Sequence, residues 1–561
     1  MQKHKLYGII ILLILSLWSV TSLFSTGFFP MHDDTQVARV VVMGDALREG
    51  QFPVRWVKEL GYGLGYPIYN FYAPLPYYAG GALYVLGVDS LIATKSMFAI
   101  GLILSSVTMY FLLYPAVGLL GALFGSVLFL YAPYHAVQAY IRGSVGEYWA
   151  IAFIPIVLLG IIDAYRSKSP SRGVILSSIG MAGIILSHTI LGFVSTLLFI
   201  AGWFMFIVYA FLINPQPFNR IIIPLYVLVL GLFMSAFFWL PAYLELGYTS
   251  VSTMITTAPT VFTDHFVCPA QLWNSSWGYA GSAPGCLYDG ISFKLGKFHV
   301  VISVTAFVLL LMTYVMRKRR PGVFLFFAGL ALLVISVFGM LPVSLEFWNI
   351  FPFTSYIQYP WRLLSFCIVA MALIGAYLNR LIYPIFLRRL IMVFLIISCI
   401  GINAKLFKPQ FTYPRDSIAF ESKEDIGYRV SKISDEYLPS GVQKPKDLSE
   451  IKSNVVESDE NTRVHIVKNT ATYLLAKVDS NTDTFVVINT VHFPGWRYFV
   501  NSIEIVPTFH NQLPSIPIMP GKTIIEARFE NTRVRSIGNI LSIFAILVIG
   551  GLLYYESKTN R

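Results

Sequence analysis

Apolar runs of about 20 residues recur along the chain, and a helix needs about that length to cross the roughly 30 Å hydrocarbon core of a bilayer. Only 12% of the residues are charged, whereas about a quarter are charged in a typical soluble domain. The pattern therefore predicts an α-helical polytopic membrane protein with about twelve transmembrane helices. The candidate spans are 6–25, 91–113, 117–133, 148–164, 173–188, 190–213, 221–243, 299–316, 322–341, 362–379, 389–406 and 537–555.

Basic residues predict how these helices are oriented. Lys3 and Lys5 precede the first span, and no small-residue cleavage site follows it, so we expect a retained helix with a cytoplasmic N-terminus. The other basic connections then fall on the same side, as the positive-inside rule requires. The net charge of +12 comes partly from them, which favours membrane lipid over nucleic acid as a partner. We expect a multi-pass plasma-membrane protein with both termini cytoplasmic. These connections contain Arg166, Lys168, Arg172, Arg220, Arg317, Lys318, Arg319, Arg320, Arg380, Arg388, Arg389, Lys558 and Arg561.

The same topology divides the chain into three regions. Residues 1–406 form a transmembrane domain, and residues 26–90 form its first outer loop, with an interfacial helix at 75–88. Residues 407–535 lie outside, and 536–561 form the last span and a cytoplasmic tail. The first half of 407–535 is charged and irregular. The second half alternates in "TRVHIVK", "TYLLAKV", "TFVVINTVHF" and "KTIIEARFE", which predicts a small extracytoplasmic β-sandwich.

The cysteines agree with this topology. Cys268 and Cys286 share one predicted outer loop, so we expect a disulfide between them, whereas Cys367 and Cys399 lie within spans. No Walker A, HExxH or CxxC motif occurs, which argues against an ATP-driven pump, a zinc protease and a thiol oxidoreductase.

The stretch "FFPMHDDTQV" places His32 and two adjacent carboxylates, Asp33 and Asp34, at the outer end of the first span. One interpretation is functional, because a carboxylate near hydrocarbon and a second charge can acquire a pKa that suits a general base. The alternative is a helix cap, in which one aspartate accepts a backbone hydrogen bond before "TQVARVVV".

Other polar residues recur at the predicted outer ends of spans. Arg142 and Glu147 in "YIRGSVGEYW" would hold a phosphate and support a sugar hydroxyl or an acceptor, or would form a salt-bridged loop. His188 would be a ligand, a base or a hydrogen-bonded interface residue. Arg362 would bind a lipid phosphate or snorkel, and Tyr359 beside it, like Trp361, would contact the sugar or belong to the aromatic belt.

These motifs together resemble a known family. The stretches "HDDTQVARVVVMGDALREGQFPVRW", "GLGYPIYNFYAPLPYY", "YAPYHAVQAYIRGSVGEYWA", "SHTILGF" and "QYPWRLLSF" are similar to the membrane proteins labelled 6-pyruvoyl-tetrahydropterin synthase-related. The first span, the acidic pair and the long interfacial loop resemble the GT-C superfamily of membrane glycosyltransferases. The stretches "HFPGWRYFVNSIEI" and "PGKTIIEARFENTRVRSIG" are similar to the C-terminal end of its YfhO-like branch.

The resemblance implies a GT-C-type glycosyltransferase that takes a sugar from a polyprenyl-phosphate carrier and transfers it to an extracytoplasmic glycan, lipid or protein acceptor. It gives Asp33 or Asp34 the role of general base. In some GT-C members this aspartate also helps to hold a divalent cation such as Mg²⁺ or Mn²⁺, and no other cofactor is expected. The rival interpretation is a non-catalytic protein that transports or scaffolds the assembly of a surface polysaccharide or lipid.

The enzyme interpretation predicts one shared polar site, because several ionisable groups at equal depth in a bilayer are best tolerated around a common wet cavity. The residues expected to converge there are His32, Asp33, Asp34, Arg142, Glu147, His188 and Arg362.

Overall fold

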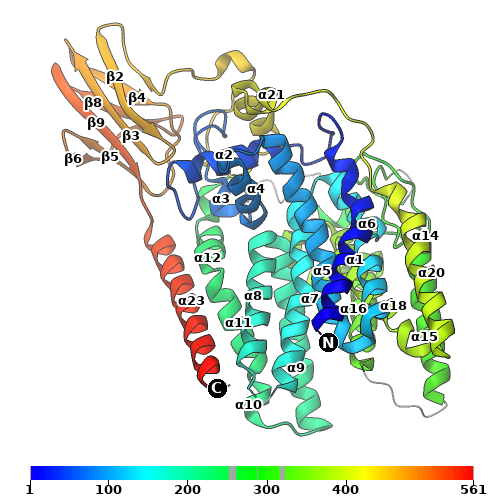
Figure 1. Cartoon of the computed structure of the whole chain (residues 1–561). Helices are drawn as coiled ribbons and strands as arrows, with labels where there is room; N and C mark the ends of the chain where they lie inside the picture. The colour runs from blue at the N-terminus through cyan, green and yellow to red at the C-terminus, as the bar shows by residue number, and fades with distance from the viewer. Residues whose placement is uncertain (1, 168, 252–260, 287–288, 316–321, 560–561) are drawn as a thin grey trace.

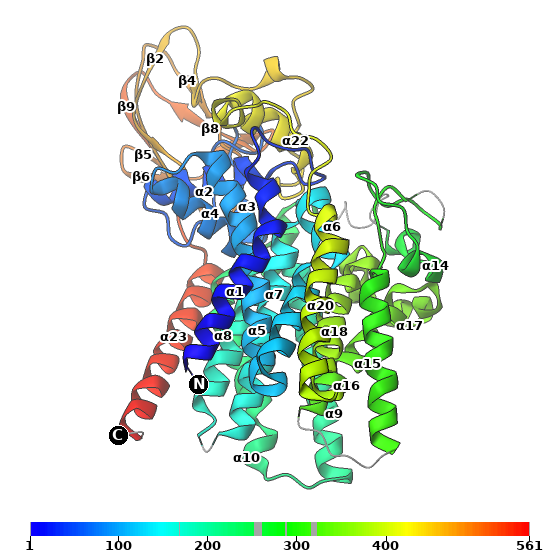
Figure 2. The ribbon, with the colours of Figure 1, turned by 45° about the vertical axis from the view of Figure 1, so that its right-hand side comes forward.

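The computed structural model describes residues 2–559, apart from 168, 252–260, 287–288 and 316–321. Figure 1 shows a helical bundle with a β domain at one end, and the first outer loop lies between them. We call the end that carries the β domain the outer end and the opposite end the inner end. Helix α1 (Gln2–Val20) begins and α23 (Arg533–Thr559) ends at the inner end, as Figure 2 also shows.

Within the described residues, eight helices are long and apolar enough to cross a membrane, or nine if the pair bent by 74° at α11 (Ile223–Met234) and α12 (Ala236–Leu244) counts as one span. The predicted count of about twelve is therefore not confirmed. Helix α8 (Ser171–Ser187) and the apolar stretch Lys297–Thr313 of α15 are shorter. The other helices of the bundle are α5 (Ser90–Leu130), α7 (Val145–Arg166), α9 (Thr189–Leu212), α15 (Lys297–Val315), α16 (Val323–Met340), α18 (Leu364–Ala376) and α20 (Ile385–Asn403).

Helix α5 accounts for two predicted spans, 91–113 and 117–133. Gly118 breaks its helical geometry with φ of 76°, and the chain folds back there. Lys95 in the first arm donates to the Ser25 carbonyl beyond the C-terminal end of α1, and Tyr110 donates to Lys5 near its N-terminal end. Tyr131 after the second arm donates to Leu15, again toward the outer end. A glycine is required at the turn because positive φ strains other residues.

The first outer loop forms α2 (Gln36–Arg48), α3 (Ile68–Phe71) and α4 (Leu75–Val85), so the helix expected at 75–88 is present. Nearly every side chain of α2 is buried within the protein, so other parts of the chain cover this helix of the predicted interfacial loop. Helix α2 packs chiefly against α4 and α5, and residues 417–433 also cover it. These residues form α21 (Ser417–Glu421), η9 (Glu424–Val430) and α22 (Ser431–Ile433). Buried Arg39 of α2 donates to Ser434 over 3.0 Å.

The β domain consists of two antiparallel sheets. One has strand order β1–β4–β8–β7, and the other has order β2–β3–β9–β5–β6. Alternate side chains of the longer strands are buried, such as Leu474, Ala476 and Val478, so the alternation seen in the sequence supplies the core. The strands are β1 (Val456–Glu457), β2 (Thr462–Thr470), β3 (Tyr473–Ser480), β4 (Thr484–Ile488), β5 (Trp496–Val500), β6 (Ile503–Ile505), β7 (Thr508–His510), β8 (Leu513–Ile518) and β9 (Gly521–Phe529).

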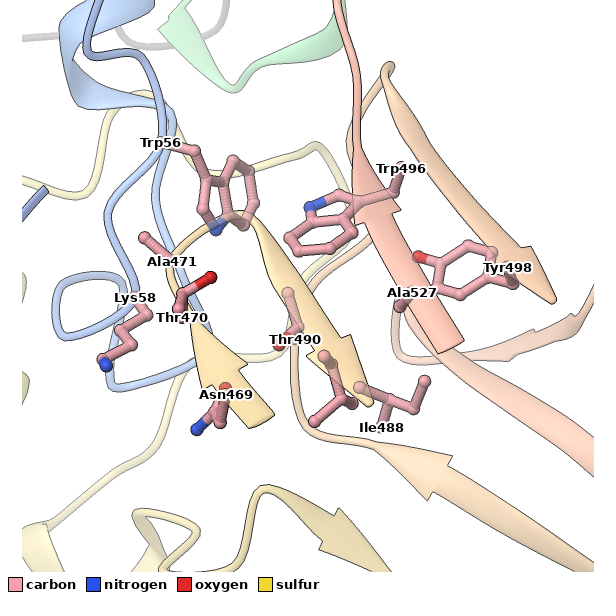
Figure 3. Close-up of a pocket in the computed structure, with 11 residues that line it drawn as sticks. Trp56, Lys58, Asn469, Thr470, Ala471, Ile488, Thr490, Trp496, Tyr498 and Ala527 are labelled. Carbon is pink, nitrogen blue, oxygen red and sulfur yellow. The ribbon is translucent and has the colours of Figure 1, made fainter. Parts of the chain in front are cut away.

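Aromatic packing joins the β domain to the first outer loop. The ring of Trp56 lies 5.6 Å from that of Trp496 and 5.2 Å from that of Phe529. Figure 3 shows the small cavity beside these rings, which has a volume of about 20 Å³. Both indole N–H groups are buried without a partner in the described part of the chain. A cavity of this size holds about one water molecule, so this junction is a packed joint and is too small for a sugar.

Candidate functional site

The centre of the candidate site is Glu147 in the first turn of α7. The chain before it forms η2 (Gln138–Arg142) and then turns at Gly143, whose φ is 66°. A Cβ at Gly143 would collide with Met31, so the turn also needs glycine for space. The turn brings Arg142 back over the start of α7, where a carboxylate also complements the positive end of the helix dipole.

Two arginines from distant parts of the chain bind the Glu147 carboxylate. Arg142 donates to both of its oxygens, with Nη2 2.8 Å from Oε1. Arg362 in η7 (Pro360–Leu363) donates from Nε to the same Oε1 over 3.1 Å, and the His188 ring lies 3.9 Å away. Glu147 is fully buried. Of the two roles predicted for Glu147, a salt bridge and a substrate contact, the salt bridge is present.

Neutral donors and aromatic rings complete this cluster, which we call the Glu147 cluster. Gln138 and Tyr134 donate to Oε2 over 3.3 and 3.4 Å. The Arg142 guanidinium lies 4.5 Å from the ring centre of Trp361, and Arg362 lies 4.9 Å from that of Tyr359. The two rings stack 5.0 Å apart. Two guanidiniums face one carboxylate here, so one positive charge remains for a further anion.

Asp33 adjoins this cluster. Its backbone N–H donates to the Arg142 carbonyl over 2.9 Å, and the preceding His32 N–H donates to Ile141 over 3.0 Å. Burial lowers the pKa of Arg142, but the carboxylates of Glu147 and Asp33 more than offset burial and raise it overall. In the described part of the chain, no hydrogen bond or ion pair holds the half-buried Asp33 carboxylate. It is therefore an available anion beside a cationic cluster.

Asp34 points elsewhere. Its carboxylate accepts from Arg429 Nη1 over 2.8 Å, and Arg429 also binds Asp425. Asp425 is fully buried and binds Arg415 as well, which completes what we call the Asp425 cluster. Burial raises the pKa of Asp34, and Arg429 opposes that shift. The two adjacent aspartates therefore have different surroundings, because a segment almost 400 residues away (a separation of 395) binds Asp34. A cavity shared by both aspartates stays a prediction.

Helix capping does not explain the acidic pair. The N-cap residue of α2 is Thr35, and no side chain forms a cap hydrogen bond there. Gln36 instead donates to the Gly143 carbonyl over 2.8 Å and so ties α2 to the turn of the Glu147 cluster. The capping alternative is contradicted.

The two predicted histidines have structural contacts. His32 donates from Nε2 to the Tyr279 carbonyl over 3.3 Å, and burial lowers its pKa. Tyr279 belongs to the loop closed by the Cys268–Cys286 disulfide, whose Cα atoms lie 5.8 Å apart, so the predicted pairing is present. His188 caps α9, since its Nδ1 accepts from the Leu191 N–H over 3.1 Å.

Sequence reasoning missed the Asp425 cluster. The charged stretch "ESKEDIGYRV" resembles a solvated face, and only the four-residue spacing of Asp425 and Arg429 hinted at a pair. It also missed Tyr134 and Gln138, which look like ordinary residues of an aromatic-rich loop.

The residues of the site do not form a binding site for the divalent cation that some GT-C members hold at this aspartate. Asp34 is bound to Arg429, and Asp33 stands alone beside Arg142, so the pair offers no shared set of ligands. Among the described residues, no group of three or more His, Cys, Asp and Glu side chains could hold a metal ion.

Comparison with known proteins gives a family match. Residues 69–408 match a model described as a 6-pyruvoyl-tetrahydropterin synthase related domain of a membrane protein. No curated protein matches the chain.

Three solved structures have a similar arrangement at low identity. The arabinofuranosyltransferase AftD from Mycobacteria aligns with 74% of this chain at 16% identity and a TM-score of 0.45, and this chain spans only 28% of it. The oligosaccharyltransferase of Archaeoglobus fulgidus aligns with 80% of this chain and 58% of its own, at 16% identity and a TM-score of 0.38. ArnT from Cupriavidus metallidurans bound to undecaprenyl phosphate aligns with 76% of each chain, at 11% identity and a TM-score of 0.35.

Proposed function

The chain belongs to the 6-pyruvoyl-tetrahydropterin synthase-related family of membrane proteins, and from that premise we propose that it is a GT-C-type glycosyltransferase. In this proposal it transfers a sugar from a polyprenyl-phosphate carrier to a glycan, lipid or protein acceptor. The motif resemblance to the GT-C superfamily suggests the reaction class. The observation that carries the proposal is the unpaired Asp33 carboxylate beside the Glu147 cluster, which has one excess positive charge.

Asp33 is the proposed general base. An acceptor oxygen or nitrogen attacks the anomeric carbon, and its proton passes to the Asp33 carboxylate. The bond between that carbon and the phosphate oxygen breaks, and polyprenyl phosphate leaves with the bonding electrons. Configuration at the anomeric carbon is inverted because attack and departure occur on opposite faces.

The arginines have the complementary role. Arg142 and Arg362 would stabilise the negative charge that develops on the leaving phosphate. Glu147 is fully buried and bonded to both, so we assign it as a positioning residue rather than a catalytic one. Tyr359 and Trp361 keep the guanidiniums in place by stacking against them and against each other.

The test compares the two adjacent aspartates. Purified protein in nanodiscs is given a panel of polyprenyl-phosphate-linked hexoses and pentoses together with glycan and lipid acceptors, and release of polyprenyl phosphate is measured. Asp33→Asn should lower the rate by about 10²- to 10⁴-fold, the usual contribution of a general base. Asp34→Asn is the matched control and should retain most of the activity. Donor binding without turnover by the wild type would contradict the proposal and favour the transport or scaffolding role. Full activity of Asp33→Asn would contradict the assignment of Asp33 as the general base.

We also propose that the outer end is extracytoplasmic and both termini are cytoplasmic. The basic connections favour this orientation, and α1 and α23 meet the inner end together. Cysteine labelling checks it, since Cys367 and Cys399 are buried and the other two cysteines are bonded. An impermeant thiol reagent should label Lys477→Cys on intact cells, and Arg172→Cys only after permeabilisation.

A further inference from the structure

A large apolar groove lies far from the Glu147 cluster. It has a volume of about 570 Å³ and runs between α5, α7, α9 and α16. Its lining includes Leu158, Ile162, Phe199, Phe206 and Phe324. The groove reaches Arg166 at the inner end of α7, 19 residues after Glu147, which is about 28 Å along a helix. It therefore belongs to the opposite end of the bundle from the proposed catalytic site.

The groove opens sideways from the bundle. Gly202 of α9 lines it and is exposed. A Cβ added at Gly202 would meet nothing within 4 Å. An apolar channel of this size that opens toward hydrocarbon is filled by an apolar chain, because an empty one would forfeit dispersion contacts along its whole lining.

Basic side chains stand at the inner mouth of the groove. Arg166 lines it and is exposed. Arg220 is fixed beside it, since its Nη1 donates to the Tyr165 carbonyl over 3.2 Å and Tyr165 donates back to the Arg220 carbonyl over 2.8 Å. In the ranges that the structure describes, neither arginine forms an ion pair with a carboxylate. The mouth is thus cationic where the groove itself is apolar.

We propose that this groove is a binding site for an anionic phospholipid, independent of the proposed transferase activity. One acyl chain lies between α7, α9 and α16, and the lipid phosphate meets Arg166 and Arg220. The apolar lining accepts any acyl chain, so selectivity for anionic lipid comes from the two arginines. A polyprenyl-phosphate donor would not serve here, because its phosphate would lie at the wrong end of α7 for Asp33.

Native mass spectrometry of the purified full chain tests this proposal with three probes: phosphatidylglycerol, phosphatidylcholine and undecaprenyl phosphate. The wild type should retain phosphatidylglycerol over phosphatidylcholine. Each of Arg166→Gln and Arg220→Gln should reduce that preference roughly five-fold, the effect of one basic residue near an anionic headgroup. Equal retention of the two phospholipids by the wild type would overturn the proposal.

A matched pair of glycine variants locates the site. Gly202→Phe fills the groove and should abolish the retained phosphatidylglycerol. Gly401→Phe on α20 is the control, because Gly401 is also an exposed helical glycine with nothing within 4 Å of its added Cβ. Unchanged retention in Gly202→Phe, or equal loss in both variants, would refute the groove as the site. Undecaprenyl phosphate retained more strongly than phosphatidylglycerol, and lost in Gly202→Phe, would assign the groove to the carrier instead.

Discussion

The Glu147 and Asp425 clusters share a common centre, a carboxylate between two arginines, but differ in their surroundings. Each centres on a fully buried carboxylate held by two arginines. The arginine side chains of the Glu147 cluster are 8% and 10% exposed, whereas those of the Asp425 cluster are 30% and 32% exposed. The charged groups of the Glu147 cluster are stabilised mainly by one another, whereas the arginines of the Asp425 cluster are also solvated by water.

The adjacent aspartates belong one to each cluster. Asp34 supplies the second carboxylate of the Asp425 cluster, so two arginines there face two carboxylates. Asp33 lies against Arg142 without an ion pair in the described part of the chain. The comparison teaches that the Asp425 cluster pairs each arginine with a carboxylate and ties the first outer loop to residues 415–429. The Glu147 cluster has no second carboxylate bound to its arginines, and the proposed binding of an anionic donor depends on this difference.

The largest expected effect comes from the central carboxylates. Glu147→Gln keeps the shape of the side chain but leaves two buried guanidiniums without an anion, so it should lower the free energy of unfolding by about 3–5 kcal/mol. Asp425→Asn is the matched variant and should cost about 1–2 kcal/mol, because both of its arginines reach water. Thermal unfolding of the two purified variants measures the difference.

A charge-balanced variant keeps this prediction testable if Glu147→Gln fails to fold. The double variant Glu147→Gln with Arg142→Gln removes one charge of each sign and should recover part of the lost stability. Equal costs for Glu147→Gln and Asp425→Asn would show that exposure of the arginines does not distinguish the clusters.

The Cys268–Cys286 disulfide should stabilise the region around His32 and Asp33 and not the Asp425 cluster. Its loop joins cysteines 18 residues apart and carries Tyr279, which binds His32. Cys268→Ser should cost about 2–4 kcal/mol, the usual value for a loop of this length. Unfolding with and without dithiothreitol checks the prediction, since the reductant should destabilise the wild type and not the variant. A variant as stable as the wild type would contradict it.

Arg429→Gln should have a smaller effect. It removes the ion pair with Asp34, whose side chain is 22% exposed, and one of the two ion pairs of Asp425, which stays bound to Arg415. We expect a loss of about 1 kcal/mol, typical of partly exposed pairs, and nearly unchanged transferase activity. Severe loss of activity at wild-type stability would give Arg429 a role in the site and erase the contrast between the clusters.

The smallest effect concerns pH. Burial raises the folded-state pKa of Asp34 above the ordinary value of an aspartate, against the opposing effect of Arg429. The folded state therefore binds this proton more tightly, and its contribution to stability is present below the unfolded pKa and lost as pH rises through the folded one. The wild type should gain stability relative to Asp34→Asn as pH falls from about 7 to 4. A difference between the two proteins that does not vary with pH, or that varies in the opposite direction, would contradict the stated pKa shift.

Local sequence pattern predicted much of the architecture. Apolar length indicated the membrane helices, and alternation indicated the strands of the β domain, because each pattern reports how one element buries its own side chains. The predicted number of spans is not confirmed where two spans join in one broken helix, as in α5, or where helices are short or bent, as at α8 and α11–α12. Apolar length reports neither the angle nor the depth of a helix. Local pattern could not predict the burial of α2, because the elements that cover it, α4, α5 and residues 417–433, are brought against it only in the folded chain.

The candidate site, too, was predictable from the sequence only in part. The sequence alone determined which residue types stand at the outer ends of the helices, since an ionisable group is costly within hydrocarbon and is restricted to the ends. Only the tertiary structure decided their pairing: Glu147 with Arg362, 215 residues away, and Asp34 with Arg429, 395 residues away. Two adjacent aspartates are chemically equal in a sequence. They differ in the fold because burial and the nearest opposite charge decide whether a carboxylate is bound or available, and both are set by segments that the chain brings together only when it folds.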